Sequence, residues 1–258
     1  MKAGISPACL FPELTERALG TLLGLGCDRV EIFLNSPSEC GDAYTKGLAR
    51  MLLSAGAVCT ALHPYSSESE GSSFFGRYPR RFDDGVEEYK RYFHQCGILG
   101  ADIVVFHGAR TFFPVAKETY FERFARLTAV AASFGVRLCH ENVVRFFCAD
   151  PAFVRELRAA VPEAGFVLDI KQAVRAGVDP LEMLDAMGPS VRHLHLSDHS
   201  EAGDCLLPGN GKFDILHMVD RLKLMQFDGN LILELYRRNF ESPEQLLTSM
   251  KYIQNICA

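Results

Sequence analysis

The sequence predicts one α/β domain over residues 1–258, a closed (β/α)8 TIM barrel. Short apolar, β-branched runs alternate with amphipathic stretches, and parallel strands need such helical crossovers. Eight strand-helix units fit into 258 residues, and about 250 residues is the typical length of such a barrel. An open doubly wound sheet would usually begin with a glycine-rich turn. Gly20, Gly24 and Gly26 instead lie within and after a helical pattern, so the barrel is favoured.

The elements follow one another along the whole chain. Apolar and β-branched runs predict strands at residues 2–6, 29–35, 58–64, 103–108, 137–143, 165–171, 191–198 and 231–236. Amphipathic patterns predict helices at residues 14–26, 86–100, 119–135, 152–165, 180–188, 213–229 and 242–256. Residues 65–83 form one long segment without a clear pattern. Such a segment is either a substrate lid or a flexible loop at a subunit contact, which leaves a homo-oligomer open.

Composition narrows the function classes. The chain has 27 Lys plus Arg against 32 Asp plus Glu, a formal net charge of -5, which disfavours a nucleic-acid partner. No run of about 18 apolar residues predicts a membrane span, and the first residues lack the apolar run of a signal peptide. The nine cysteines contain no CxxC pair. They predict reduced thiols in a cytoplasmic protein rather than disulfides or a zinc ribbon.

Ionisable side chains follow one strand after another, at the end where barrels of this class carry their chemistry. In chain order these are His63, His107, Glu141, Asp169, His193, His195, Asp198, His199 and Glu234. Alternate residues of a strand share a face, which directs Asp169 and Glu234 into the barrel interior. Cys139, two residues before Glu141, is expected to be small apolar filler.

Carboxylates inside a barrel are costly unless a cation neutralises them. Glu141, Asp169, His195 and Glu234 therefore predict a site for one divalent ion, such as Mn, Zn, Co or Mg. Two simpler interpretations stay open at this point. A single histidine near a strand end is often a hydrogen-bonded core residue, and a single inward glutamate can pair with Arg137 or Arg192.

The motifs together resemble a known family. They are HEN after the fifth strand, LDIKQAVRAG after the sixth, HLHLSDH followed by LLPGNGKFD, and the final LILELY. In order and at this spacing they resemble the xylose-isomerase-like barrels, which include sugar isomerases, ketose 3-epimerases and endonuclease IV. The resemblance implies a metal held by Glu141, Asp169, His195 and Glu234. It also implies that Glu141 and Glu234 act as acid and base in proton transfer through an enediolate.

The chain departs from the family pattern at two positions. Members often carry DxxH after the sixth strand, where this chain has Gln172, and endonuclease IV needs a histidine where this chain has Leu206. Glutamine is a poor metal ligand and cannot act as a base. The resemblance therefore implies a sugar isomerase or epimerase over an abasic-site nuclease. His63 and His107 match positions that hold a further zinc in that nuclease, so a second metal stays open.

Further residues at the strand ends are candidates for substrate binding. A small sugar or sugar phosphate is the expected partner, and cationic or amide groups can bind its hydroxyls, a carboxylate or a phosphate. The candidates are His63, His107, Gln172, Arg145, His199 and Lys171. A third interpretation is a barrel that binds a sugar without catalysis. The inward carboxylates argue against it, because they would destabilise the fold without a function.

Overall fold

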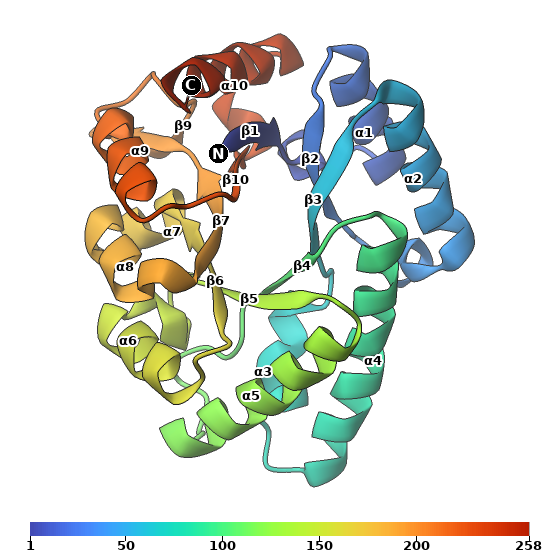
Figure 1. Cartoon of the computed structure of the whole chain (residues 1–258), viewed down its shortest axis with the longest axis vertical. Helices are drawn as coiled ribbons and strands as arrows, with labels where there is room; N and C mark the ends of the chain where they lie inside the picture. The colour runs from blue at the N-terminus through green and yellow to red at the C-terminus, as the bar shows by residue number, and fades with distance from the viewer. Residues whose placement is uncertain (258) are drawn as a thin grey trace.

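The computed structural model describes residues 1–257, and its core is a closed barrel of eight parallel strands (Figure 1). Around the barrel the strands are arranged in the order β1, β10, β7, β6, β5, β4, β3 and β2. Their bounds are β1 Lys2–Ile5, β2 Arg29–Phe33, β3 Val58–His63, β4 Ile103–Phe106, β5 Arg137–Glu141, β6 Gly165–Asp169, β7 Val191–Leu196 and β10 Asn230–Leu233. The predicted fold class is confirmed.

Helices cover the outside of the barrel. They are α1 Thr15–Gly24, α2 Asp42–Ala55, α4 Pro79–Ile98, α5 Lys117–Ser133, α6 Pro151–Ala160, α8 Pro180–Met187, α9 Ile215–Leu224 and α10 Pro243–Cys257, with the short α3 Glu70–Phe74 and α7 Ile170–Arg175. Their apolar faces pack on the strands and form one large core cluster. Among the residues described, no helix is long and apolar enough to cross a membrane.

A second, smaller apolar cluster fills the barrel interior. It consists of Ala61, Ile103, Val105, Cys139 and Val167. Along β5, Cys139 faces the same side as Glu141, and along β6, Val167 faces the same side as Asp169. Each polar side chain therefore lies two residues further along its strand than an apolar one. The predicted filler role of Cys139 is confirmed. The apolar layer closes the barrel beneath the polar site.

The strands end earlier than the sequence pattern predicts. β6 ends at Asp169, and Lys171 belongs to α7; β10 ends at Leu233, so Glu234 follows the strand. The pattern extends further because apolar residues continue into the loops, whereas the backbone pairing between strands stops. After β7 the chain forms an unpredicted hairpin of β8 Asp198–Ser200 and β9 Gly203–Leu206.

The segment 65–83 is not irregular, and this expectation was wrong. It contains the 3-10 turn Ser67–Ser69, the helix α3, and the first turns of α4, which begins at Pro79. Phe74 and Phe75 are buried, and the Phe75 ring stacks on Tyr120 with 3.8 Å between centroids. Burial of these rings holds the segment against the barrel, a contact that local sequence periodicity does not report.

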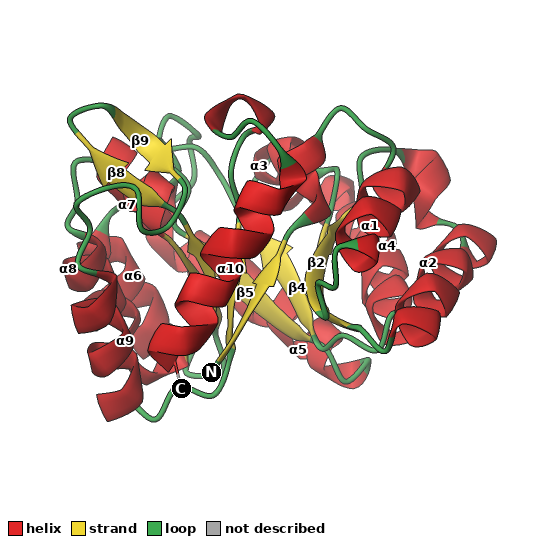
Figure 2. Ribbon diagram, turned by 90° about the horizontal axis from the view of Figure 1, so that it is seen from above, coloured by secondary structure: helices red, strands yellow, loops and turns green. Residues whose placement is uncertain are grey.

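The carboxyl ends of the barrel strands carry the hairpin and α3. Figure 2 shows β8, β9 and α3 at one end of the barrel and the chain termini at the other. Asp198 orders the loop after the hairpin, because its carboxylate accepts hydrogen bonds from the backbone N–H groups of Gly209, Gly211 and Phe213. Asp198 therefore has a structural role, and the loop leads into α9.

Candidate active site

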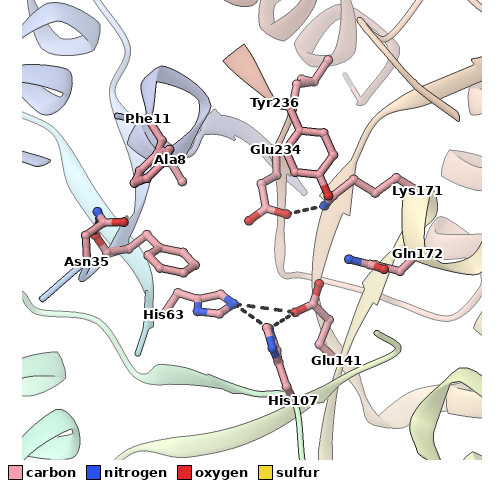
Figure 3. A pocket seen from close by; sticks show the side chains of 12 residues that line it. Ala8, Phe11, Asn35, His63, His107, Glu141, Lys171, Gln172, Glu234 and Tyr236 are labelled. Carbon is pink, nitrogen blue, oxygen red and sulfur yellow. Dashed lines mark hydrogen bonds and ion pairs between the residues drawn. The ribbon is translucent and has the colours of Figure 1, made fainter. Parts of the chain in front are cut away.

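A cavity of about 340 Å³ opens at the carboxyl ends of the strands. Apolar and polar side chains both line it (Figure 3). The apolar ones are Ala8, Phe11, Phe33, Leu235 and Tyr236, and the polar ones are Asn35, His63, His107, Glu141, Lys171, Gln172 and Glu234. Concave sites of this kind, with a few converging polar groups, are typical of small-molecule binding.

Four predicted ligands converge beneath this cavity. Glu141, Asp169, His195 and Glu234, here called the tetrad, each place one oxygen or nitrogen within 4.8 Å of the others. His195 Nδ1 lies 3.1 Å from Glu141 Oε1, 3.6 Å from Asp169 Oδ2 and 3.5 Å from Glu234 Oε2. The adjacent strands β5, β6, β7 and β10 bring these groups together.

Lys171 contacts two members of the tetrad. Its Nζ donates to Asp169 Oδ2 and Glu234 Oε2, the same oxygens that face His195. The side chain is almost fully buried in the first turn of α7. The ammonium therefore partly balances the charge of the three carboxylates. The inward glutamates pair with Lys171 and histidines, whereas Arg137 and Arg192 make no ion pair with them among the described residues.

A second group of ligand-type residues shares Glu141. Glu141 Oε2 lies 2.8 Å from His107 Nε2 and 3.7 Å from His63 Nε2, and the two histidine nitrogens are 2.9 Å apart. The Phe33 ring stacks on His63 with 4.2 Å between centroids and an interplanar angle of 18°. Glu141 thus links the tetrad to the histidine pair on the cavity wall (Figure 3).

The electrostatics of the site favour the charged forms of Glu141 and His195 despite burial, whereas burial raises the pKa of Asp169. Burial by itself would raise the pKa of Glu141, but His195 and His107 hold that pKa well below its usual range. Burial would lower the pKa of His195, yet Glu31, Glu234 and Glu141 raise it. Three carboxylates in one buried site favour a nearby cation, a role that Lys171 and His195 fill in part.

Glu31 contacts the tetrad, although it was not predicted from the sequence. It lies in β2, is fully buried, and its Oε2 accepts hydrogen bonds from His195 and His193. The available signal was an isolated glutamate within the apolar strand RVEIF. Such a residue is rarely buried without partners.

Glu70 was also not predicted. Its carboxylate accepts hydrogen bonds from the backbone N–H groups of His107 and Gly108 and from the Tyr89 hydroxyl. It therefore links α3 to the residues directly after β4, the first of which is His107. No sequence signal could have found it, because its partners come from distant segments.

The other predicted substrate-binding residues lie in different places. Gln172 lines the cavity, and its Oε1 accepts a hydrogen bond from the backbone of Val144. Arg145 is exposed, with φ 68°, and does not line the cavity. His199 packs against Phe213, also away from the cavity. The structure thus brings His63, His107, Lys171 and Gln172 together, but not Arg145 or His199.

The donor set of the tetrad fits a divalent cation. It offers three carboxylate oxygens and one imidazole nitrogen, each within 4.8 Å of the rest. This mixture of ligands suits Zn, Mn or Co, which accept nitrogen and oxygen donors. A third group consists of Glu31, His193 and His195, in which both histidine Nε2 atoms are already hydrogen-bonded to Glu31 Oε2, at 2.7 and 2.9 Å.

Comparisons with known proteins place this architecture in a family. A family model described as xylose isomerase-like TIM barrel matches residues 21–256. An uncharacterized protein of Mycobacterium leprae is 28% identical, covering 97% of this chain and 94% of its own.

Solved structures share the fold at low sequence identity. The D-psicose 3-epimerase of Clostridium cellulolyticum H10, solved with D-tagatose, gives a TM-score of 0.79 at 16% identity, covering 100% of this chain and 98% of that one. The IolI protein, solved with a bound zinc atom, gives 0.75 at 20% identity, covering 100% and 95%. Since the family model spans most of the residues and the barrel is closed, this chain belongs to the xylose isomerase-like TIM barrel family.

Proposed function

We propose that this protein is a metal-dependent sugar isomerase or epimerase that transfers a proton through an enediolate. The observation that carries the proposal is that two glutamates, Glu141 and Glu234, line one cavity (Figure 3). Both lie close to His195 Nδ1, at 3.1 and 3.5 Å. The resemblance of the site motifs to those of ketose 3-epimerases supports it.

The proposed reaction assigns proton transfer to the two glutamates and metal binding to the tetrad. One glutamate removes the carbon-bound proton next to a carbonyl, and the other returns a proton to the opposite face or to the neighbouring carbon. Glu141, Asp169, His195 and Glu234 would hold the metal. When bound, a divalent cation polarises the carbonyl and the adjacent hydroxyl and stabilises the negative charge that develops.

The cavity favours an uncharged sugar over a sugar phosphate. Among its described lining residues, Lys171 is the one Lys or Arg, and two carboxylates already neutralise it. A phosphate would need free cations at this position. The apolar side chains of the lining, such as Phe33 and Tyr236, suit the face of a sugar that carries its C–H groups. We therefore propose a neutral ketose or keto sugar derivative as the substrate.

The experiment is solvent exchange in deuterated water. The purified protein is mixed with Mn²⁺ or Co²⁺ and a panel of ketoses, with and without phosphate, and carbon-bound deuterium is followed by NMR. We expect exchange in at least one neutral ketose. Glu141→Gln and Glu234→Gln should each reduce exchange by at least about 100-fold, as expected for a lost acid or base. Cys139→Ala, the matched interior control, should exchange like the wild type.

The absence of exchange from every ketose, with any of the metals, would contradict this function. Exchange confined to sugar phosphates would overturn the choice of a neutral substrate and leave the reaction type standing.

The pairing of His63 and His107 with Glu141 favours one second candidate, an abasic-site nuclease with more than one metal. Gln172 and Leu206 stand where such a nuclease needs imidazoles, and the net charge is -5. Nicking of abasic duplex DNA together with several metals per chain, measured by mass spectrometry, would favour it over the isomerase. Tight sugar binding without metal or turnover would favour a non-catalytic barrel. The free cysteines support a cytoplasmic location, whichever of these functions the protein has.

A further inference from the structure

Glu31 crosses the barrel interior to reach a residue of the tetrad. It belongs to β2, whereas His195 belongs to β7, and β1 and β10 separate these two strands in the barrel. Glu31 Oε2 lies 2.9 Å from His195 Nε2 and 2.7 Å from His193 Nε2. All three side chains are buried, with at most 1% exposed.

The bonds to Glu31 determine which ring nitrogen of His195 keeps its hydrogen. An ionised carboxylate can only accept hydrogen bonds, so both histidine Nε2 atoms that contact Glu31 must carry hydrogen. Nδ1 of His195 is hydrogen-bonded to Glu141 Oε1 when no metal is bound, and with a metal at the tetrad Nδ1 would give up its hydrogen and act as the ligand. Nδ1 faces Glu141 Oε1 at 3.1 Å and lies within 3.6 Å of Asp169 Oδ2.

The cost of burying Glu31 argues that it is more than packing. Its second oxygen, Oε1, is buried and has no hydrogen-bond partner among the described residues, and the same holds for His193 Nδ1. A buried polar atom without a hydrogen-bond partner destabilises a fold. A leucine would fill this space at lower cost, so the carboxylate must contribute something else.

We propose that Glu31 is a positioning residue that holds His195 in the Nε2–H tautomer and aims Nδ1 at the metal site. The inference rests on the metal site of the proposed function and adds a residue that touches neither metal nor substrate. Carboxylates that orient a ligating histidine in this way typically change metal affinity by 10- to 100-fold.

The first test measures metal affinity without substrate. Mn²⁺ is titrated into the wild type, Glu31→Gln and His193→Gln by calorimetry. Glu31→Gln should bind Mn²⁺ about 10- to 100-fold more weakly. His193→Gln is the matched control, because it removes a partner from the same oxygen of Glu31 but leaves His195 bonded; it should stay within about threefold of the wild type. Equal weakening in both variants, or in neither, would overturn the inference.

The second test needs no variant. Long-range ¹H–¹⁵N NMR of the wild type loaded with Zn²⁺, which is diamagnetic, reports which ring nitrogen of His195 carries hydrogen. We expect hydrogen on Nε2 and a change in the ¹⁵N chemical shift of Nδ1 when the metal binds. Hydrogen on Nδ1, or a wild type that binds neither Mn²⁺ nor Zn²⁺, would overturn the inference.

The two proposals fail separately. Weaker metal binding in Glu31→Gln, with no exchange from any ketose in the wild type, would retain the role of Glu31 and reject the isomerase. Exchange in the wild type, together with unchanged Mn²⁺ affinity in Glu31→Gln, would retain the isomerase and reject the role of Glu31.

Discussion

Lys171 lines the cavity, as the sequence predicts, but its partners were not predicted. The sequence pattern placed it at a strand end as a group for binding substrate, and the structure pairs its Nζ with Asp169 and Glu234. Burial alone would lower the pKa of Lys171, but Asp169 and Glu234 raise it well above its usual value. The side chain is therefore a cation held at two oxygens that also belong to the candidate metal site.

Removing this charge should strengthen metal binding. A divalent ion near an ammonium is repelled by several kcal/mol at the effective dielectric constant of a partly buried site. We expect Lys171→Met to bind Mn²⁺ at least about tenfold more tightly, measured by calorimetry. Lys212→Met removes an exposed lysine paired with Glu201 and should bind like the wild type. Weaker binding in Lys171→Met would mean that the lysine supports the metal site.

At the scale of the element, β5 presents different chemistry on its two faces. Glu141 points into the barrel, while His140 points outward, is fully buried, and shares a 2.7 Å hydrogen bond with the Tyr120 hydroxyl of α5. Burial lowers the pKa of His140 to about 3. One strand thus holds a charged catalytic candidate and a neutral structural histidine at adjacent positions, because successive residues face opposite sides.

The neutral form of His140 makes stability depend on pH. In the unfolded chain its pKa is about 6.5, so the unfolded state binds the additional proton between about pH 6.5 and pH 3. Stability from this group is therefore present at neutral pH and falls as pH is lowered through that window. Between pH 7 and pH 5 the loss is about 2 kcal/mol.

The measurement is urea unfolding of the wild type and His140→Gln at pH 7 and pH 5. The difference in unfolding free energy between the two should shift by about 2 kcal/mol in favour of the variant at pH 5. His217→Gln, at an exposed position, should show no such shift. A difference that does not change with pH would show that His140 is protonated in the folded state.

The segment 65–83 shows where prediction of elements fails. Its sequence has no regular apolar period, yet Glu70 accepts hydrogen bonds from the backbone directly after β4, and Phe74 packs against Phe106 with 5.6 Å between centroids. These partners lie more than thirty residues further along the chain. A short helix held by distant contacts is stabilised by tertiary packing and not by local propensity.

At the scale of the whole molecule, three buried or partly buried carboxylates meet at one end of the barrel. Glu141, Asp169 and Glu234 come from the ends of three strands, and Lys171 and His195 offset their charge within the site. Mutual repulsion of these carboxylates opposes closure of the barrel. A cation that binds only the folded state must therefore stabilise the entire fold.

Metal should raise the melting temperature. With Mn²⁺ at about 100 times its dissociation constant, the stabilisation is about 2.7 kcal/mol, or about 5–10 °C for a chain of this length. Scanning calorimetry with Mn²⁺ and then with excess EDTA measures the rise and its reversal. Glu234→Gln should show a smaller rise than the wild type at the same Mn²⁺ concentration. A melting temperature unchanged by any divalent ion would contradict the metal site.

The sequence by itself determined the eight strands, their parallel order and the convergence of Glu141, Asp169, His195 and Glu234. These features follow from local periodicity, since alternation along a strand and the common end of parallel strands decide which residues share a rim. Only the tertiary structure paired Lys171 with two carboxylates and brought Glu31 across to His195. Such contacts depend on side-chain reach across a closed barrel, which no local pattern encodes.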